Sequence, residues 1–159
     1  MRPRPKCCAA CTRDEMPNRS LDLVLVNQPA EISRLVDRLE AFGAETGLPP
    51  EVAYRLMLSL DEVVANVIRH GFQDDGEHQI RVHVEVSGDQ VTAVVEDDGL
   101  EFDPRDAPLP NLEAPLDDRG IGGLGMHLVR ESMDSIDYRR QGDRNVFTMA
   151  TSLTPRTES

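Results

Sequence analysis

The stretch Leu60-Asp-Glu-Val-Val-Ala-Asn-Val-Ile-Arg-His-Gly71 decides how the rest of the chain is interpreted. It belongs to a segment that opens with Pro49 and Pro50, and we expect this segment to be helical up to about Gly71, because proline suits the first turn of a helix. Apolar side chains recur at helical spacing through the segment. They form one stripe that we expect to face the core: Leu56, Leu60, Val63, Val64 and Val67.

Three polar residues mark one edge of this predicted helix. Glu62, Asn66 and His70 recur every four positions, which places them along one edge, about 120° from the apolar stripe. A solvated helix edge would explain this spacing. A carboxylate and a carboxamide one turn apart also suit Mg²⁺, which prefers oxygen ligands, and the carboxylate could deprotonate a nucleophile. The spacing alone leaves both interpretations open.

Outward from this helix, periodic and alternating apolar residues predict the remaining elements. We expect strands over residues 21–26, 80–86, 91–96, 135–140 and 145–153, and further helices over residues 30–46 and 126–133. A long loop over residues 99–119 separates the third strand from the last helix. The order β-α-α-β-β-loop-α-β-β predicts an α+β fold, a two-layer α/β sandwich whose helices cover one face of a mixed, mostly antiparallel sheet.

Composition narrows the possible functions. The chain of 159 residues carries 17 Lys and Arg against 29 Asp and Glu, a net charge of −12, and we therefore expect no direct binding of nucleic acid, whose phosphates need a basic surface. No apolar run approaches the roughly 20 residues of a membrane span, and no apolar segment follows the basic first residues as in a secretory signal. We expect a cytoplasmic protein with no membrane partner. Lys6 is the only lysine, so any phosphate chemistry in the folded part depends on arginine, backbone amides and a metal ion.

The sequence predicts one folded domain over residues 20–153, with a tail over residues 154–159. Residues 1–19 hold five basic and two acidic residues with three prolines, and they predict a disordered basic N-terminal arm. All the cysteines lie in this arm, at Cys7, Cys8 and Cys11. A zinc site needs about four ligands, so an arm without metal is favoured over a metal or redox function.

Two further segments lie where predicted elements end or begin. Asp97-Asp-Gly99 ends a strand, where an acidic side chain can accept a hydrogen bond from a nucleobase amino group and glycine lets the backbone pass close to the base. Asp-Gly more commonly marks only a turn. Gly120-Ile-Gly-Gly-Leu-Gly-Met126 precedes a helix, and its backbone N–H groups with the helix N-terminus can bind an anion, although a hinge would also explain the glycines. No βαβ context surrounds this segment and no lysine follows it, so it is neither a dinucleotide fingerprint nor a P-loop.

The three segments occur in order, each at the edge of a predicted element, and together they resemble the GHKL ATPase superfamily of gyrase, Hsp90, histidine kinases and MutL. The stretch from Leu60 to Gly71 resembles the N-box, Asp97-Asp-Gly99 the adenine-binding box, and Gly123-Leu-Gly-Met126 the second glycine box. The His-Gly pair that ends the N-box, the Glu101-Phe-Asp-Pro104 run and the short length are similar to one branch, the anti-sigma-factor serine kinases of bacterial partner-switching systems. The fold implied is the two-layer sandwich of the GHKL (Bergerat) type.

The resemblance implies a role for individual residues. Glu62 would be the catalytic carboxylate that accepts the proton of a serine hydroxyl, and Asn66 would bind both ATP and Mg²⁺. Asp97 would receive the adenine amino group, with Gly99 beside the base. Residues 100–119 would form a lid over ATP. The other implied ATP-binding residues are Gly120, Gly122, Gly123, Leu124, Gly125 and, near the adenine, Asn145.

Two positions depart from the pattern of the superfamily. Glu101 stands where many relatives have glycine, a feature common in the favoured branch. Kinase relatives also carry an arginine just before the glycine box, where it stabilises charge on the transferring phosphoryl group. Arg119 is the one basic residue available there and is expected to be catalytic, although it lies slightly early.

The function implied is an anti-sigma factor with ATP-dependent serine kinase activity. It would phosphorylate a STAS-type anti-anti-sigma antagonist and sequester a sigma factor, whose basic DNA-binding faces suit an acidic partner. Relatives are often dimers, which makes a homodimer one expected assembly. Two alternatives stay open: a nucleotide-binding partner-switch module without kinase activity, and a detached histidine-kinase catalytic domain, which would need a partner that presents a histidine on a helix bundle.

Overall fold

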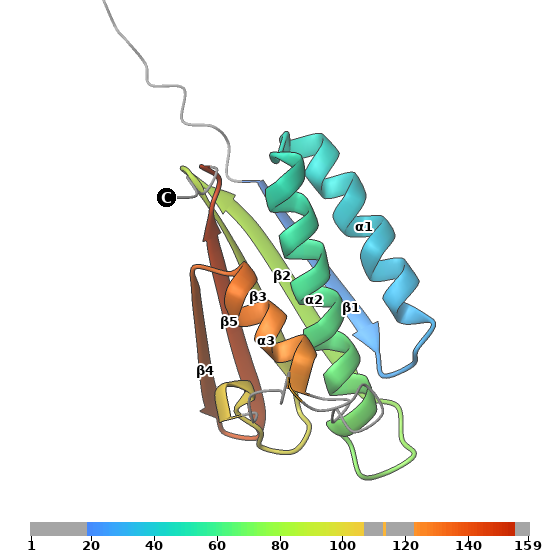
Figure 1. Ribbon diagram of the computed structural model, residues 1–159. Helices are drawn as coiled ribbons and strands as arrows, with labels where there is room; N and C mark the ends of the chain where they lie inside the picture. Colours follow the sequence, from blue (N-terminus) through green and yellow to red (C-terminus); the bar gives the residue numbers. More distant parts are fainter. Residues whose placement is uncertain (1–18, 107–112, 114–122, 155–159) are drawn as a thin grey trace, which may run out of the picture.

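The computed structural model describes residues 19–106, residue 113 and residues 123–154 (Figure 1). Most of the expected N-terminal arm and C-terminal tail lies outside the described residues. So do most of the expected lid and three of the expected site residues, namely Arg119, Gly120 and Gly122.

Five strands and three α-helices make up the described fold, which confirms the predicted α+β class. The elements are β1 (Arg19–Val26), α1 (Glu31–Thr46), α2 (Pro50–His70), β2 (Gln79–Ser87), β3 (Gln90–Asp97), a short 3₁₀ turn η1 (Pro104–Asp106), α3 (Gly123–Ser132), β4 (Ser135–Gln141) and β5 (Arg144–Ser152). The strands form one sheet in the order β1-β2-β3-β5-β4. All four pairings are antiparallel. The three helices cover one face of this sheet, with α2 between α1 and α3 (Figure 1).

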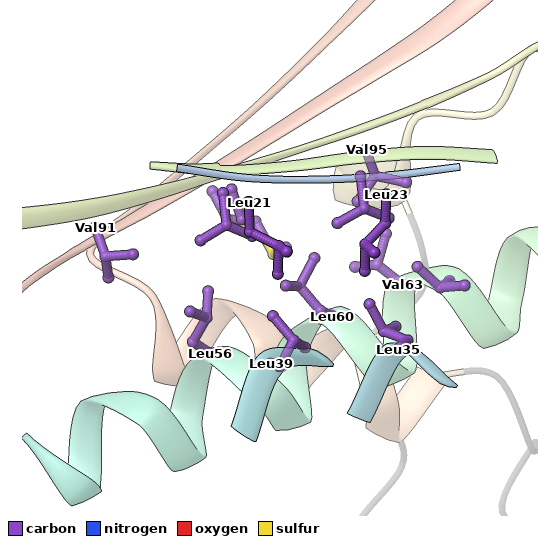
Figure 2. Packing of buried hydrophobic residues seen from close by; sticks show 14 of the residues in the cluster. Leu21, Leu23, Leu35, Leu39, Leu56, Leu60, Val63, Val91 and Val95 are labelled. Carbon is purple, nitrogen blue, oxygen red and sulfur yellow. The ribbon is translucent and has the colours of Figure 1, made fainter. Parts of the chain in front are cut away.

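The core lies between the helices and the sheet (Figure 2). Alternate residues of the strands point into it, while α1 and α2 contribute their apolar stripes. Leu35, Leu60 and Val64 are completely buried, and burial of each such side chain stabilises the fold by about 1.5–3 kcal/mol. The stripe predicted on α2 therefore packs as expected, and the polar edge of that helix is left beside the core. Among the described residues, no helix is both long and apolar enough to cross a membrane.

The two ends of α2 and the start of α3 determine which residues lie next to the candidate site. Pro50 opens α2, as its fixed φ angle favours, and the N–H of Gly71 donates to the carbonyl of Val67 to close the last turn at 2.8 Å. The third helix begins at Gly123 rather than at Met126 as predicted. Two glycines of the glycine box therefore belong to the first turn of α3, and the physical reason is a close contact with α2.

Candidate functional site

The end of α2 meets the end of β3 through the backbone. The N–H of Leu100 donates to the carbonyl of Gly71 at 2.8 Å. A Cβ atom on Gly99 would collide with the same carbonyl oxygen and would lie 2.8 Å from Oδ1 of Asp97. Only glycine fits this position without movement of the neighbouring backbone. The structure thus joins two segments that lie far apart in the sequence, the end of the N-box and the Asp97-Asp-Gly99 box.

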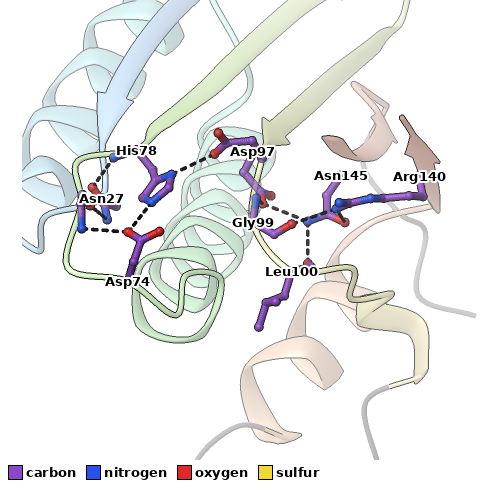
Figure 3. Close-up of polar contacts among 10 residues, drawn as sticks. Asn27, Asp74, His78, Asp97, Gly99, Leu100, Arg140 and Asn145 are labelled. Atoms are coloured by element: carbon purple, nitrogen blue, oxygen red, sulfur yellow. Dashed lines mark hydrogen bonds and ion pairs between the residues drawn. The ribbon is translucent and has the colours of Figure 1, made fainter. Parts of the chain in front are cut away.

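Asp97 presents one occupied and one open carboxylate oxygen. The side chain is buried, with 5% exposure, and its Oδ1 accepts hydrogen bonds from the Gly99 N–H at 2.8 Å and from Asn145 Nδ2 at 2.9 Å (Figure 3). Its Oδ2 makes no hydrogen bond with any other residue that the structure describes. Burial raises the pKa of this carboxyl, and the two hydrogen bonds only partly oppose the shift. A donor from a bound molecule would offset the cost of burying the open oxygen.

Glu62 and Gly125 form the contact that brings α2 against α3. A Cβ atom on Gly125 would overlap the carboxylate of Glu62, so this side chain lies directly on the backbone of the first turn of α3. The Glu62 side chain is 27% exposed, and its Oε1 lies 3.9 Å from Nη2 of Arg69, two turns further along α2. The first N–H groups of a helix lack intrahelical partners and attract anions. The contact therefore places a carboxylate beside a helix N-terminus that is suited to bind phosphate.

Asn66 lies one turn after Glu62 on α2 and is half-buried, whereas His70 at the end of the same edge is exposed. Within the described ranges, no group of three or more His, Cys, Asp or Glu side chains is placed to hold a metal ion. A cation at this edge would depend on the amide oxygen of Asn66 and on oxygens brought by a ligand. Mg²⁺ is commonly bound in this way, with few protein ligands and several from phosphate and water, so the residues fit it.

Replacement of Gly125 by alanine tests the α2–α3 contact. The added methyl group overlaps Glu62, and overpacking of this kind destabilises proteins by about 1–3 kcal/mol. We expect Gly125→Ala to lower the free energy of unfolding by this amount in urea titrations. The matched control is Gly43→Ala in α1, where the Cβ would meet only Ala53 Cβ, at 3.5 Å; it should be neutral or stabilising.

A double variant separates this contact from simple loss of helix stability. Glu62→Ala removes the side chain that the new methyl group would meet. Gly125→Ala introduced into the Glu62→Ala background should therefore cost much less than it does in the parent protein. Equal costs in the two backgrounds would show that the destabilisation by Gly125→Ala does not come from overlap with Glu62.

The loop after α2 supplies contacts that nothing in the sequence indicated. The ring of His78 stacks on Phe72, with centroids 4.2 Å apart. Its Nε2 lies 2.7 Å from Asp74 (Figure 3), and its Nδ1 lies 3.3 Å from Asp98. The hydrogen bond to Asp74 is the main cause that raises the pKa of His78, and the same bond lowers the pKa of Asp74. These contacts hold the loop against Asp98, the residue next to the open carboxylate of Asp97.

Two further residues at the Asp97 end also lack a local sequence signal. Tyr138 and Arg140 of β4 both donate to the side-chain oxygen of Asn145, at 2.6 and 3.0 Å. Arg140 also donates to the carbonyl of Gly99 at 2.9 Å. The tight turn of the closing hairpin was the one available signal, because it pairs Arg140 with Asn145 across the two strands.

Comparisons with known proteins agree with the family resemblance that the sequence motifs indicated. The sequence model of the histidine kinase-like ATPase domain matches residues 25–151. Serine/threonine-protein kinase BtrW of Bordetella bronchiseptica is 29% identical over 102 residues, which cover 64% of this chain and 72% of the relative. An anti-sigma F factor of Clostridium beijerinckii is 27% identical over 79 residues, or 50% of this chain and 55% of that protein.

The fold also resembles a solved structure. A crystal structure of the RsbU and RsbW domains of a Mycobacterium tuberculosis protein superposes with a TM-score of 0.61 at 17% identity. The match covers 84% of this chain and 32% of the solved chain, so the present chain spans about a third of that protein. At this level of identity the likeness shows the fold.

Proposed function

Because the chain belongs to the histidine kinase-like ATPase domain family, we propose that it is an ATP-dependent protein serine kinase of a bacterial partner switch. It phosphorylates a STAS-type anti-anti-sigma antagonist and, in its other state, binds and sequesters a sigma factor. The names of its relatives, a serine/threonine-protein kinase and an anti-sigma factor, support this class. The observation that carries the proposal is the contact between Glu62 and the first turn of α3, because it puts a carboxylate at a phosphate-binding helix end.

The proposed ATP site extends from the end of β3 to the first turn of α3. The adenine amino group donates to the open oxygen of Asp97, and Gly99 lets the base lie against the backbone, as in the superfamily that the sequence resembles. The phosphates bind the glycine box before and within α3. The residues proposed for this part are Gly120, Gly122, Gly123, Leu124 and Gly125, with Arg119 as the side chain that stabilises the transferring phosphoryl group. Asn145 supports the adenine end through its hydrogen bond to Asp97.

Asn66 is the residue proposed to hold Mg²⁺, through its amide oxygen. When bound, the ion neutralises negative charge on the phosphates. Asn66 is half-buried and lies one turn after Glu62, on the same edge of α2.

Transfer requires a base on the attacking hydroxyl. The serine oxygen of the antagonist forms a bond to the γ-phosphorus as the bond from that phosphorus to the β,γ-bridging oxygen breaks, and ADP leaves. Glu62 accepts the hydroxyl proton. Its side chain is 27% exposed and lies against α3, so it is accessible to a partner that docks at this end. Phosphoserine adds a charge of about −2, which favours release of the antagonist from an acidic chain and leaves the protein free for its sigma factor.

A transfer assay tests this function. The full chain is incubated with Mg·ATP and, one at a time, with the purified STAS-domain proteins of its source organism, and the products are mapped by mass spectrometry. We expect an acid-stable phosphate on one serine of one antagonist. Nucleotide binding without transfer to any of them would support the binding-module alternative. An acid-labile phosphate on the histidine of a helical partner would support the histidine-kinase alternative.

Asp97→Asn should abolish recognition of the base without harm to the fold. The asparagine can still accept from Gly99 and Asn145 with its oxygen, but its amide nitrogen replaces the open oxygen and repels the adenine amino group. We expect at least about 50-fold weaker binding of Mg·ATP by calorimetry. The unfolding temperature at neutral pH should not fall, because burial already disfavours the ionised carboxylate.

Asp98→Asn is the matched control for this prediction. Asp98 is the neighbouring carboxylate, is exposed, and contacts His78 rather than Asn145. Its replacement should leave the ATP affinity close to that of the parent.

The pH dependence of stability gives a second check on Asp97. Because burial raises the folded-state pKa of Asp97, the parent gains stability as the pH falls through that pKa. Asp97→Asn should lack this gain. If Asp97→Asn bound ATP as tightly as the parent, Asp97 would not be part of the ATP site.

A further inference from the structure

A row of three polar residues crosses three neighbouring strands at the adenine end of the site. Asp97 of β3 pairs with Asn145 of β5, and Asn145 pairs with Arg140 of β4. Directly paired residues point to the same face of a sheet, and Asp97 and Asn145 are both buried on the helix-covered face. Figure 3 shows the three side chains in line, with Gly99 and Leu100 beside them.

Every hydrogen-bonding position of the Asn145 side-chain amide is used. Its Nδ2 donates to Asp97 Oδ1 at 2.9 Å and to the carbonyl of Leu100 at 2.8 Å. Its Oδ1 accepts from the hydroxyl of Tyr138 at 2.6 Å and from Arg140 Nη1 at 3.0 Å. An amide has two donors and two acceptor lone pairs, so this one is fully satisfied in a buried place, where an unmade hydrogen bond is costly.

Arg140 helps to determine which way round this amide lies, together with the two acceptors on its nitrogen side, Asp97 and the carbonyl of Leu100. If the amide of Asn145 rotated by half a turn, its nitrogen would face Arg140 and its oxygen would face the carboxylate of Asp97. Arginine can only donate, whereas a tyrosine hydroxyl can donate or accept. The reversed amide therefore conflicts with Arg140 on one side and with Asp97 and the carbonyl of Leu100 on the other. Tyr138 could adapt to it by rotation of its hydroxyl.

We propose that Arg140, assisted by Tyr138, is a positioning residue that acts through Asn145 to fix the open oxygen of Asp97 and so gives the site its preference for adenine over guanine. This inference rests on the proposed function, because it assumes that Asp97 receives the base. Arg140 also donates to the carbonyl of Gly99, so one guanidinium contacts both the amide that bonds to the carboxylate and the turn that follows it.

The preference follows from the edge that each base presents. Adenine carries an amino donor at position 6, and guanine carries an acceptor oxygen at the same position. With Oδ1 of Asp97 occupied by Gly99 and Asn145, the open oxygen offers an acceptor to the base, which matches adenine and repels guanine. Without Arg140 the amide of Asn145 loses a donor to its oxygen and is held less firmly, and the carboxyl group of Asp97 can then more easily rotate or take up a proton and pair with either base.

Arg140→Met and Tyr138→Phe test the proposal, with Arg139→Met as the matched control. Arg139 is the neighbouring arginine on β4; its side chain is 71% exposed and pairs with Asp137. Its replacement removes the same charge without contact with Asn145. The readout is the ratio of the affinities for Mg·ADP and Mg·GDP, measured by calorimetry on the full chain. Simple loosening of the fold would weaken both nucleotides together and leave this ratio unchanged.

We expect the parent and Arg139→Met to prefer Mg·ADP by at least about 100-fold. Arg140→Met should lose at least about tenfold of that preference, and Tyr138→Phe should lose less, since Arg140 still orients the amide. A ratio in Arg140→Met equal to that in Arg139→Met would overturn the proposal.

A second measurement, made without nucleotide, keeps the inference separate from the proposed function. The charged groups that act on Asp97 are Asp98 and Arg140. Carboxyl carbon NMR should show Asp97 titrating at higher pH in Arg140→Met than in Arg139→Met. Because loss of the Arg140 charge by itself raises this midpoint, Arg140→Met is also made in an Asn145→Ala background, where only the charge is lost. If the parent binds neither nucleotide, the proposed function fails, and this titration alone decides: a larger rise in the parent background than in the Asn145→Ala background supports the positioning role, and equal rises overturn it.

Discussion

Asn66→Ala is expected to slow phosphoryl transfer by at least about 10³-fold, because a metal ion stabilises the transferring charge by several kcal/mol. Alanine removes the only amide oxygen on the α2 edge that carries Glu62 and leaves the fold intact, since Asn66 is half-buried beside the apolar stripe rather than within it. The measurement is a single-turnover assay, together with calorimetry of ATP binding in the presence of Mg²⁺.

The control for this prediction is Asn66→Asp. It keeps an oxygen at the same position and should recover part of the Mg·ATP affinity that the alanine variant loses. Thermal unfolding should show that both variants remain folded. If Asn66→Ala binds ATP as tightly as the parent in the presence of Mg²⁺, Asn66 is not the metal ligand and the edge of α2 is only a solvated surface.

Glu62→Gln is expected to slow transfer by at least about 100-fold, since general base catalysis contributes about 10²–10⁴-fold. Glutamine keeps the size of the side chain and its contact with Gly125, but it cannot accept the serine proton. ATP binding and partner binding should therefore persist. In a cell, the variant should hold the unmodified antagonist and leave the sigma factor free under all conditions, which a reporter of the sigma-dependent promoter would show.

Asp61→Asn is the matched control for Glu62→Gln. It neutralises the neighbouring carboxylate, which lies one residue earlier on α2 and about 100° around the helix. The rate of transfer in this variant should match that of the parent. An equal loss in both variants would point to a general effect of charge on α2 rather than to a base at Glu62.

The family and the core could be predicted because their signals are local and periodic. The apolar stripe of α2 needs only helical spacing, and it packs into the core as predicted, with Val67 at its end only partly buried. The order of elements and the three boxes then led to the GHKL superfamily, which the domain match over residues 25–151 confirms. The individual roles implied for Glu62, Asn66 and Asp97 stay predictions, as do those of Arg119 and the first glycines, which lie outside the described residues.

The start of α3 was predicted three residues late for a physical reason. Glycine disfavours helices when judged alone, so the glycine box was expected to end as a loop at Met126. The structure begins the helix at Gly123. Gly125 packs directly on Glu62, and this contact between helices outweighs the local preference. Such a contact cannot be deduced from the glycines without knowledge of what α2 places against them.

The Arg140 row was missed because it depends on strand pairing rather than on spacing along the chain. Arg140 and Asn145 are neighbours across a tight turn, but Asp97 lies 48 residues from Asn145. From its position along the chain alone, an arginine on a closing hairpin is expected to be a surface residue. Only the register of three strands shows that it lies beside Asn145, which in turn pairs with the residue proposed to receive the adenine amino group.

The most direct test of the proposed kinase mechanism compares the parent with Glu62→Gln in a single turnover. Both proteins are saturated with Mg·ATP and mixed with the STAS-domain protein that the parent phosphorylates, and phosphoserine is followed by mass spectrometry. A rate at least about 100-fold lower for the variant, at equal nucleotide occupancy, is the predicted result. Equal rates would contradict the assignment of Glu62 as the base and, with it, the mechanism proposed for this site.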